Sequence, residues 1–163
     1  MRDEDETRAR VSCLQKTGGK IHLELAELRE KYETIIIDAG GRDSMELRSS
    51  MLVADKFFMP IRPSQFDAWT VEKIDQMVSE AQIINDKLQA FVFLNLASAN
   101  PRVNEATEAQ EYISEFDNLG LAKSVIRDRI VFRKAAQAGL SVYEMDDQKA
   151  KNEIYNLYQE VFS

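Results

Sequence analysis

The run LQAFVFLNLAS, residues 88–98, limits more than any other stretch the folds that this chain can adopt. It is continuously apolar and has the length of one strand, a pattern typical of strands that are buried on both faces of a parallel sheet. Helical and strand-like apolar spacings alternate along the rest of the chain, one βα unit after another. The sequence therefore predicts a doubly wound, mostly parallel α/β sheet of three or four strands with helices on both faces.

The individual elements follow from apolar periodicity and from cap and turn residues. Ser64 with Asp67 offers a capping box for one helix, and Asn100 followed by Pro101 is a typical start of another. One apolar stripe is expected along the first of these helices: Ile74, Met77, Val78, Ala81 and Ile84. Strands are expected at 35–37, 54–61, 88–98 and 123–126, with a minor strand at 11–14. Helices are expected over roughly 21–32, 44–52, 64–84, 100–116, 129–139 and 148–162.

Length and composition point to an ordinary globular domain. A chain of 163 residues suits one domain, 1–163, with an irregular segment over residues 1–20. No apolar run approaches the ~18 residues that a bilayer-spanning helix needs, and the opening MRDEDETRAR is too charged for a signal peptide. A cytoplasmic location without membrane contact is therefore expected. Cys13 and His22 are the only residues of their kinds, which excludes an internal disulfide and leaves a zinc site short of ligands.

Asp38 is the first candidate for chemistry, because it ends the apolar run 35–37 and is followed by Gly40 and Gly41. In a parallel sheet ligands bind at the carboxyl ends of strands, and glycines there permit close approach of the backbone. Nucleotide hydrolases use an aspartate in such a position to hold magnesium beside a phosphate. The alternative is structural, since an aspartate after a strand is as often a cap for the next helix.

A phosphate-binding loop would decide between these two interpretations. Its pattern, G-x-x-x-x-G-K-[ST], uses backbone amides and a lysine to hold phosphates. That pattern is absent from the sequence. The segment KTGGK, residues 16–20, has the right letters in the wrong order and is interpreted as a turn before the helix at 21.

Three stretches together resemble the ParA/MinD family of partition ATPases, in particular the small plasmid ParA type. They are LREKYETIIIDAGGRDSMELRSSMLVADKFFMPIRPSQFDAW, FVFLNLAS and IRDRIVFRKAAQAGLSVYE, in the order and spacing of the family. The resemblance implies an ATP-switched, dimeric DNA-segregation ATPase that binds DNA and a centromere-binding partition protein.

The resemblance also implies roles for individual residues. Asp38 matches the catalytic aspartate that holds magnesium, and Asn95 matches the strand-end asparagine near the adenine. The other implied nucleotide-site residues are the switch residues Gly40, Gly41, Arg42 and Asp43, and Arg127 and Asp128 in the segment that closes over the base.

The phosphate loop of the family, K-G-G-x-G-K-[ST], and a following strand that ends in D-x-D have no counterpart in this sequence. By resemblance both would precede residue 1, so the chain is expected to be a family member without its amino-terminal quarter. A shortened chain, a misplaced start or a decayed gene would each account for this. No cofactor is therefore expected for the chain alone, and ATP and magnesium are expected only if a phosphate loop is supplied. Whether the chain is an enzyme stays open.

The net charge is −7, yet residues 123–134, KSVIRDRIVFRK, form one basic island. Because the family binds DNA without sequence preference, the resemblance implies phosphate contacts from this island. A solvated helix face explains the same charges equally well. The candidates for DNA contact are Arg129, Arg133 and Lys134, and weaker ones are Lys123, Lys149 and Lys151.

Two alternatives to a partition protein remain. A receiver-type signalling domain also ends a strand with an aspartate, but VSCLQK and KSVIRD lack its acidic pair and its Lys-Pro. A non-catalytic α/β interaction module needs no ligand at all. In the family fold the phosphate-loop strand lies beside 35–37, so its absence is expected to leave an exposed apolar edge. Self-association or a rearranged segment 9–16 is expected to cover that edge.

Overall fold

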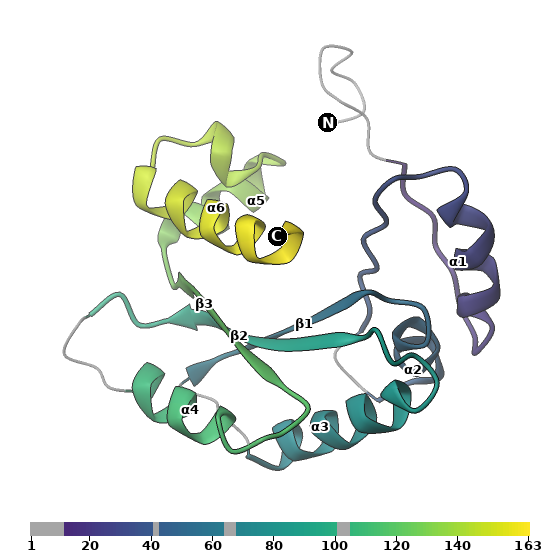
Figure 1. Ribbon diagram of the computed structural model, residues 1–163. Helices are drawn as coiled ribbons and strands as arrows, with labels where there is room; N and C mark the ends of the chain where they lie inside the picture. Colours follow the sequence, from purple (N-terminus) through teal and green to yellow (C-terminus); the bar gives the residue numbers. More distant parts are fainter. Residues whose placement is uncertain (1–11, 41–42, 64–67, 101–104) are drawn as a thin grey trace.

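The computed structural model of the chain describes residues 12–40, 43–63, 68–100 and 105–163 (Figure 1). At its centre lies a three-stranded parallel sheet in the order β1-β2-β3. The strands are β1 (Lys56–Ile61), β2 (Gln89–Ala97) and β3 (Gly120–Arg127). The α/β fold class predicted from the sequence is confirmed, because the strands are parallel and helices cover both faces of the sheet.

The helices form one layer on each side of the sheet (Figure 1). α3 and α4 make the crossovers between the strands and share one face, whereas α6 lies on the other face, mainly against β3. α1 and α2 precede the sheet and pack on each other. The bounds are α1 Ile21–Arg29, α2 Met45–Met51, α3 Ala68–Gln82, α4 Glu105–Ile113, α5 Ile130–Ala138, the 3-10 turn η3 Val142–Glu144 and α6 Gln148–Phe162.

β2 is the central strand and supplies the middle of the core. Val92 and Leu94 are completely buried and face the α3 and α4 layer, where Val78 and Ile113 are equally buried. The intervening residues of β2 are half-buried toward the α6 side, where Phe91 stacks on Phe58 of β1 with ring centroids 5.0 Å apart. The layer of α3 and α4 therefore covers the sheet more completely than the layer of α6 does.

Several predicted element boundaries need correction. α1 ends at Arg29 rather than near residue 32, and β3 begins at Gly120 rather than 123. In the predicted stripe, the members from Ile74 to Ala81 are buried, but Ile84 is 73% exposed because α3 ends at Gln82. The predicted caps at Ser64 and Asp67 and the predicted first-turn Pro101 lie outside the described residues.

The outer edge of β3 is covered by side chains of α6. The Glu160 carboxylate accepts hydrogen bonds from the backbone N–H groups of Lys123 (2.6 Å) and Ser124 (2.9 Å). The Glu153 carboxylate accepts one from the N–H of Arg127 (3.1 Å). These bonds satisfy donors that an edge strand would otherwise present to other chains.

The opposite edge of the sheet, along β1, differs from the prediction. Residues 35–37 belong to no strand, so the predicted strand there is wrong. A strand needs a neighbouring backbone for its N–H and C=O groups, and a groove separates this segment from β1. Residues 12–14 are not a strand either. Residues 12–16 are exposed and do not line that groove, so the described part of the segment 9–16 does not cover the edge.

Within the part of the chain that the structure describes, no helix is both long enough and apolar enough to cross a membrane.

Candidate functional site

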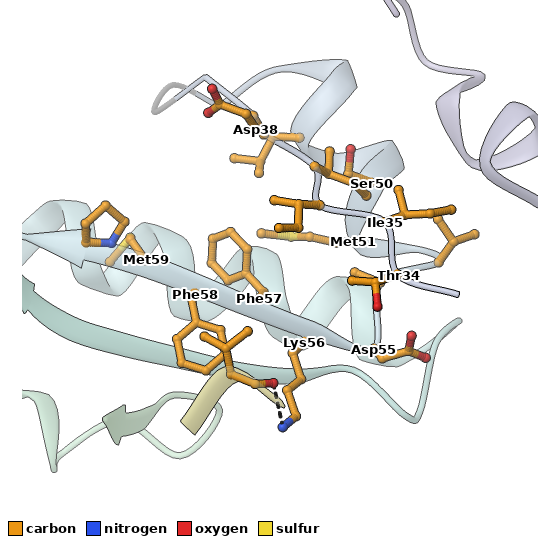
Figure 2. Close-up of a pocket in the computed structure, with 18 of the residues that line it drawn as sticks. Thr34, Ile35, Asp38, Ser50, Met51, Asp55, Lys56, Phe57, Phe58 and Met59 are labelled. Carbon is orange, nitrogen blue, oxygen red and sulfur yellow. Dashed lines mark hydrogen bonds between the residues drawn. The ribbon is translucent and has the colours of Figure 1, made fainter. Parts of the chain in front are cut away.

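Asp38 lies at one end of a groove of about 1050 Å³ that separates the segment 34–40 from the free edge of β1 (Figure 2). We call this the edge groove. Both ends of this segment line the groove: Figure 2 draws Thr34 on the side of Asp55 and Asp38 on the opposite side. Asp38 is exposed, and none of the described residues forms a hydrogen bond or an ion pair with its carboxylate. Among the described residues, none therefore competes with a ligand for this carboxylate.

The wall that carries Asp38 is anchored through α1. The Arg29 guanidinium donates to the carbonyl of Val53 (2.8 Å) and to the Asp55 carboxylate (3.0 Å), just before β1. At the other end of α1, the His22 ring shares a hydrogen bond of 2.9 Å with the Ser49 hydroxyl of α2. These contacts hold α1 against the α2 side of the sheet, and the segment that follows α1 forms the groove wall.

The predicted switch residues after Asp38 divide into a described and an undescribed part. Gly40 is exposed, and a Cβ atom placed on it would meet nothing within 4 Å. Gly41 and Arg42 lie outside the described residues. The Asp43 carboxylate accepts a hydrogen bond from Arg48 (2.7 Å) and forms an ion pair with Lys73 (3.2 Å). These two partners, Arg48 more than Lys73, lower the pKa of Asp43 to about 2. Asp43 is thus a structural link from the loop to α2 and α3.

Asn95 lies in the last part of β2, half-buried and opposite Ile126 of β3. The register shifts between Asn95 and Ala97, and Leu96 between them has a φ of 56°. A left-handed backbone conformation is uncommon for a bulky residue and is strained. Strained residues and β-bulges are both more frequent near functional sites. This irregularity is at the carboxyl end of β2, and ligands bind at that edge of the sheet in folds of this kind.

Arg127 and Arg129 converge on one buried carboxylate of α6. The Glu153 side chain accepts from Arg129 Nη2 (2.7 Å) and Nε (3.1 Å), and more weakly from Arg127 Nη1 (3.4 Å). Glu153 is 8% exposed, and the Arg129 side chain is 20% exposed. This ion pair connects the end of β3 to α6, and it leaves Arg129 little surface for a contact with DNA.

Glu153 and Glu160 were missed by the sequence reasoning. Burial acts to raise the pKa of the Glu153 carboxyl, but the hydrogen bond from Arg129 and the N–H of Arg127 outweigh it, so the pKa is lowered. The pKa of Glu160 is lowered in the same way, against burial, by its bonds to Ser124 and Lys123. The sequence did contain a signal for these two residues. They are seven residues apart in the last helix, so both lie on the same side of that helix, beside its apolar face.

Two other members of the basic island are exposed on and next to α5. Arg133 forms an ion pair with Asp128 at 3.3 Å, with the two side chains 64% and 46% exposed. Lys134 is exposed, and no described residue pairs with its ammonium group. Of the three candidates for DNA contact, Lys134 is therefore the one whose charge no acid in the described part of the chain matches.

Some of the predicted nucleotide-site residues that the structure describes line cavities. Asp38 and Gly40 line the edge groove, whereas Arg127 lines a separate hollow of about 390 Å³ between β3 and α6. Neither cavity includes Asn95 or Asp128. Asp38 and Arg127, two of the predicted nucleotide-site residues that the structure describes, therefore line different hollows.

The described residues by themselves offer a magnesium ion at this edge one carboxylate, that of Asp38. Magnesium is held by one or two carboxylates together with substrate phosphates and water. Asp38 offers one carboxylate, and the described residues contain no group of three or more His, Cys, Asp or Glu side chains placed to hold a metal. Because the sequence also lacks a phosphate-binding loop, no step of nucleotide chemistry can be derived from this chain alone.

Comparison with known proteins gives one relationship to report. No family model matches the chain. The chain is 26% identical over 143 residues to the maintenance of carboxysome distribution protein A of Halothiobacillus neapolitanus. This similarity supports a ParA/MinD-like relationship. The match covers 86% of this chain but spans 64% of the length of the curated relative. A ParA/MinD-like chain is also what the motifs around Asp38, Asn95 and Arg127 indicated.

Proposed function

We propose that this chain is the carboxyl-terminal portion of a ParA-like positioning protein, and that it does not bind nucleotide without added polypeptide. The similarity to the carboxysome distribution protein over 143 residues is the observation that carries the proposal. The parallel α/β sheet and the exposed Asp38 at its carboxyl end support it. In this proposal Asp38 holds magnesium only when a phosphate loop is supplied, and the complete protein is an ATP-switched dimer.

The cargo and the partners are part of the same proposal. The name of the relative describes the distribution of carboxysomes in its own bacterium. For this chain we propose positioning of a plasmid, chromosome or other cellular body through non-specific DNA and a centromere-binding or equivalent adaptor protein. A non-catalytic interaction module is the second candidate, and the large open edge groove together with the missing phosphate loop favours it.

Calorimetry tests the nucleotide part of the proposal. ATP with magnesium added to the chain is expected to bind with a Kd no lower than about 1 mM. The Asp38 carboxylate could contact the triphosphate only through magnesium, and the sequence has no phosphate loop to hold the phosphates themselves. Asp38→Asn is the matched control and is expected to give the same trace. Tighter binding by the unaltered chain would contradict the proposal, and loss of that binding in Asp38→Asn would then make Asp38 a ligand in this chain.

DNA retention tests the basic island. Binding to any duplex is expected to weaken as salt rises, because phosphate contacts release counterions. Arg133→Gln with Lys134→Gln is expected to reduce the slope of log affinity against log salt by about 2, since each contact contributes roughly 0.9. Lys31→Gln with Lys87→Gln, at exposed lysines outside the island, serves as the control of equal charge. Retention that does not change with salt would remove the proposed contacts.

A further inference from the structure

Four hydrogen-bond donors from the end of β3 and the residue before α5 converge on one carboxylate of α6. Glu153 Oε2 accepts from the backbone N–H of Arg127 at 3.1 Å. Glu153 Oε1 accepts from Nε and Nη2 of Arg129 at 3.1 and 2.7 Å, and from Nη1 of Arg127 at 3.4 Å. We call these four donors the arginine socket. Two guanidiniums and a backbone N–H that point to one place form a binding site for an oxyanion, and a side chain of the same polypeptide fills it.

The arginine socket has the chemistry that recognises phosphate groups. The guanidinium of arginine is planar and presents its N–H donors in a fixed fork, which matches the oxygens of a phosphate as well as those of a carboxylate. Arg129 already uses this fork, since its Nε and Nη2 both donate to the Glu153 carboxylate. A phosphate oxygen in the place of Glu153 Oε1 would receive the same hydrogen bonds.

Arg127 connects the socket to solvent. Its side chain is 43% exposed, and it lines the hollow of about 390 Å³ between β3 and α6, which Glu153 also lines. The side chains of Lys123, Asn156 and Gln159 line the same hollow and are exposed. An anion that enters the hollow therefore meets an ammonium group, side-chain amides and the outer face of Arg127 before it reaches the donors that Glu153 occupies.

A second carboxylate of α6 binds the same strand. Glu160 accepts from the successive backbone N–H groups of Lys123 (2.6 Å) and Ser124 (2.9 Å). The register between β2 and β3 shifts at this point, and successive N–H groups directed at one place bind anions. The contact between α6 and β3 thus depends on two carboxylates, seven residues apart, that occupy anion-binding donors.

Docking of α6 and binding of an external oxyanion require the same donors at the arginine socket. Donors that point to Glu153 are not available to another anion. By thermodynamic linkage, the docked helix weakens the binding of the anion, and the bound anion weakens the docking of the helix by the same factor. Both arginines belong to the basic island 123–134, so α6 sets how much of the charge of that island a partner can reach.

We propose that the arginine socket is a binding site for a phosphate group, and that Glu153 is an internal competitor that occupies the site while α6 is docked. The phosphate belongs either to a nucleic-acid backbone or to a free phosphate ion. The first source rests on the DNA binding proposed above, whereas the second does not. Arg133 and Lys134 lie outside the socket on the exposed side of α5, so Glu153 does not restrict them.

Thermal unfolding tests the socket without DNA. Glu153→Ala removes the internal anion and leaves its space beside both arginines. When about 50 mM phosphate replaces chloride at equal ionic strength, the melting temperature of this variant is expected to rise by at least about 3 °C more than that of the unaltered chain. Phosphate stabilises folded proteins in general, so Glu111→Ala, at an exposed position of α4, is the control and is expected to respond as the unaltered chain does. Equal shifts in all three proteins would overturn the proposal.

Duplex DNA tests the competition. Glu153→Gln keeps the shape of the side chain and removes its charge, so Arg127 and Arg129 become available to phosphates. The slope of log affinity against log salt is expected to steepen by about 1 to 2, since each contact contributes roughly 0.9. Glu160→Gln removes the same charge from the same helix at a site formed by backbone N–H groups, and it is expected to change the slope by less than about 0.5. Equal slopes of the two variants would overturn the competition.

The two tests together identify the source of the phosphate. A steeper slope for Glu153→Gln assigns the socket to a nucleic-acid backbone. If no variant binds the duplex, the DNA contacts of the proposed function fail, and a larger phosphate shift for Glu153→Ala would support the socket with free phosphate as its ligand. If Glu153→Ala is unfolded in chloride, recovery of its circular dichroism in phosphate is the expected result, and absence of recovery would overturn the proposal.

Discussion

Leu94→Ala is expected to lower the free energy of unfolding by about 3 kcal/mol. Leu94 has no exposed surface and lies in the central strand, opposite Ile61 of β1 and Val125 of β3. Truncation removes buried methyl groups and leaves a cavity, because strands on both sides and helices on the α3 and α4 face prevent the site from collapsing. Urea denaturation followed by far-ultraviolet circular dichroism measures the change.

Leu23→Ala is the control for this substitution. Leu23 lies on α1 and is 58% exposed, so its truncation is expected to change stability by less than about 0.5 kcal/mol. A loss below about 1 kcal/mol for Leu94→Ala would mean that the centre of the sheet is not close-packed. The position of Asn95, the next residue along β2, would then not be fixed by the core either.

The central strand could be predicted from the sequence because its burial is recorded in its own residues. The run 88–98 is apolar at every residue that must be covered, and the spacing from Ile74 to Ala81 faces it. The fold class follows from those two patterns. Ile84 shows the limit of the same reasoning, since the apolar spacing continues past Gln82 but the helix does not.

The edge of the sheet could not be predicted in the same way. Residues 35–37 have the composition of a strand, yet a strand forms only where a neighbouring backbone completes its hydrogen bonds. The composition of residues 35–37 shows that they could form a strand. Whether they do depends on a neighbouring backbone that the composition of the segment does not specify. Asp38 was predicted to end a strand at 35–37, but the segment that carries it is not a strand, and the groove beside it arises from the separation of two segments and has no sequence motif.

Charge patterns were the least informative part of the sequence. The basic island could be recognised in the sequence as a cluster of positive charges. The acid that pairs with Arg129, however, is Glu153 of α6, 24 residues away. Nothing in the spacing of the island separates Arg129, which is largely covered, from the exposed Arg133. Pairing between distant elements is a tertiary property, and it changes which charges remain available for a partner.

Glu153→Ala is expected to lower the free energy of unfolding by about 2 kcal/mol or more, because it leaves the partly buried Arg129 guanidinium and the Arg127 N–H without an acceptor. A fully buried pair would cost about 3–5 kcal/mol, and the part of Arg129 that reaches solvent reduces this. Glu111→Ala, at an exposed position of α4, is the control. Adding Arg129→Met to Glu153→Ala is expected to restore part of the loss, and full additivity of the two changes would contradict a direct interaction.

The pH dependence gives this interaction a signature that packing alone would not. The pKa of Glu153 is lower in the folded chain than its ordinary value of 4.5, so the folded state binds fewer protons than the unfolded state as that group titrates. Its contribution is therefore complete above pH 4.5 and is lost as pH falls through the lower, folded-state pKa. The stability difference between the unaltered chain and Glu153→Gln is expected to shrink in acid. A difference that stays constant from neutral pH into that range would mean that Glu153 stabilises the β3 and α6 contact by shape rather than by charge.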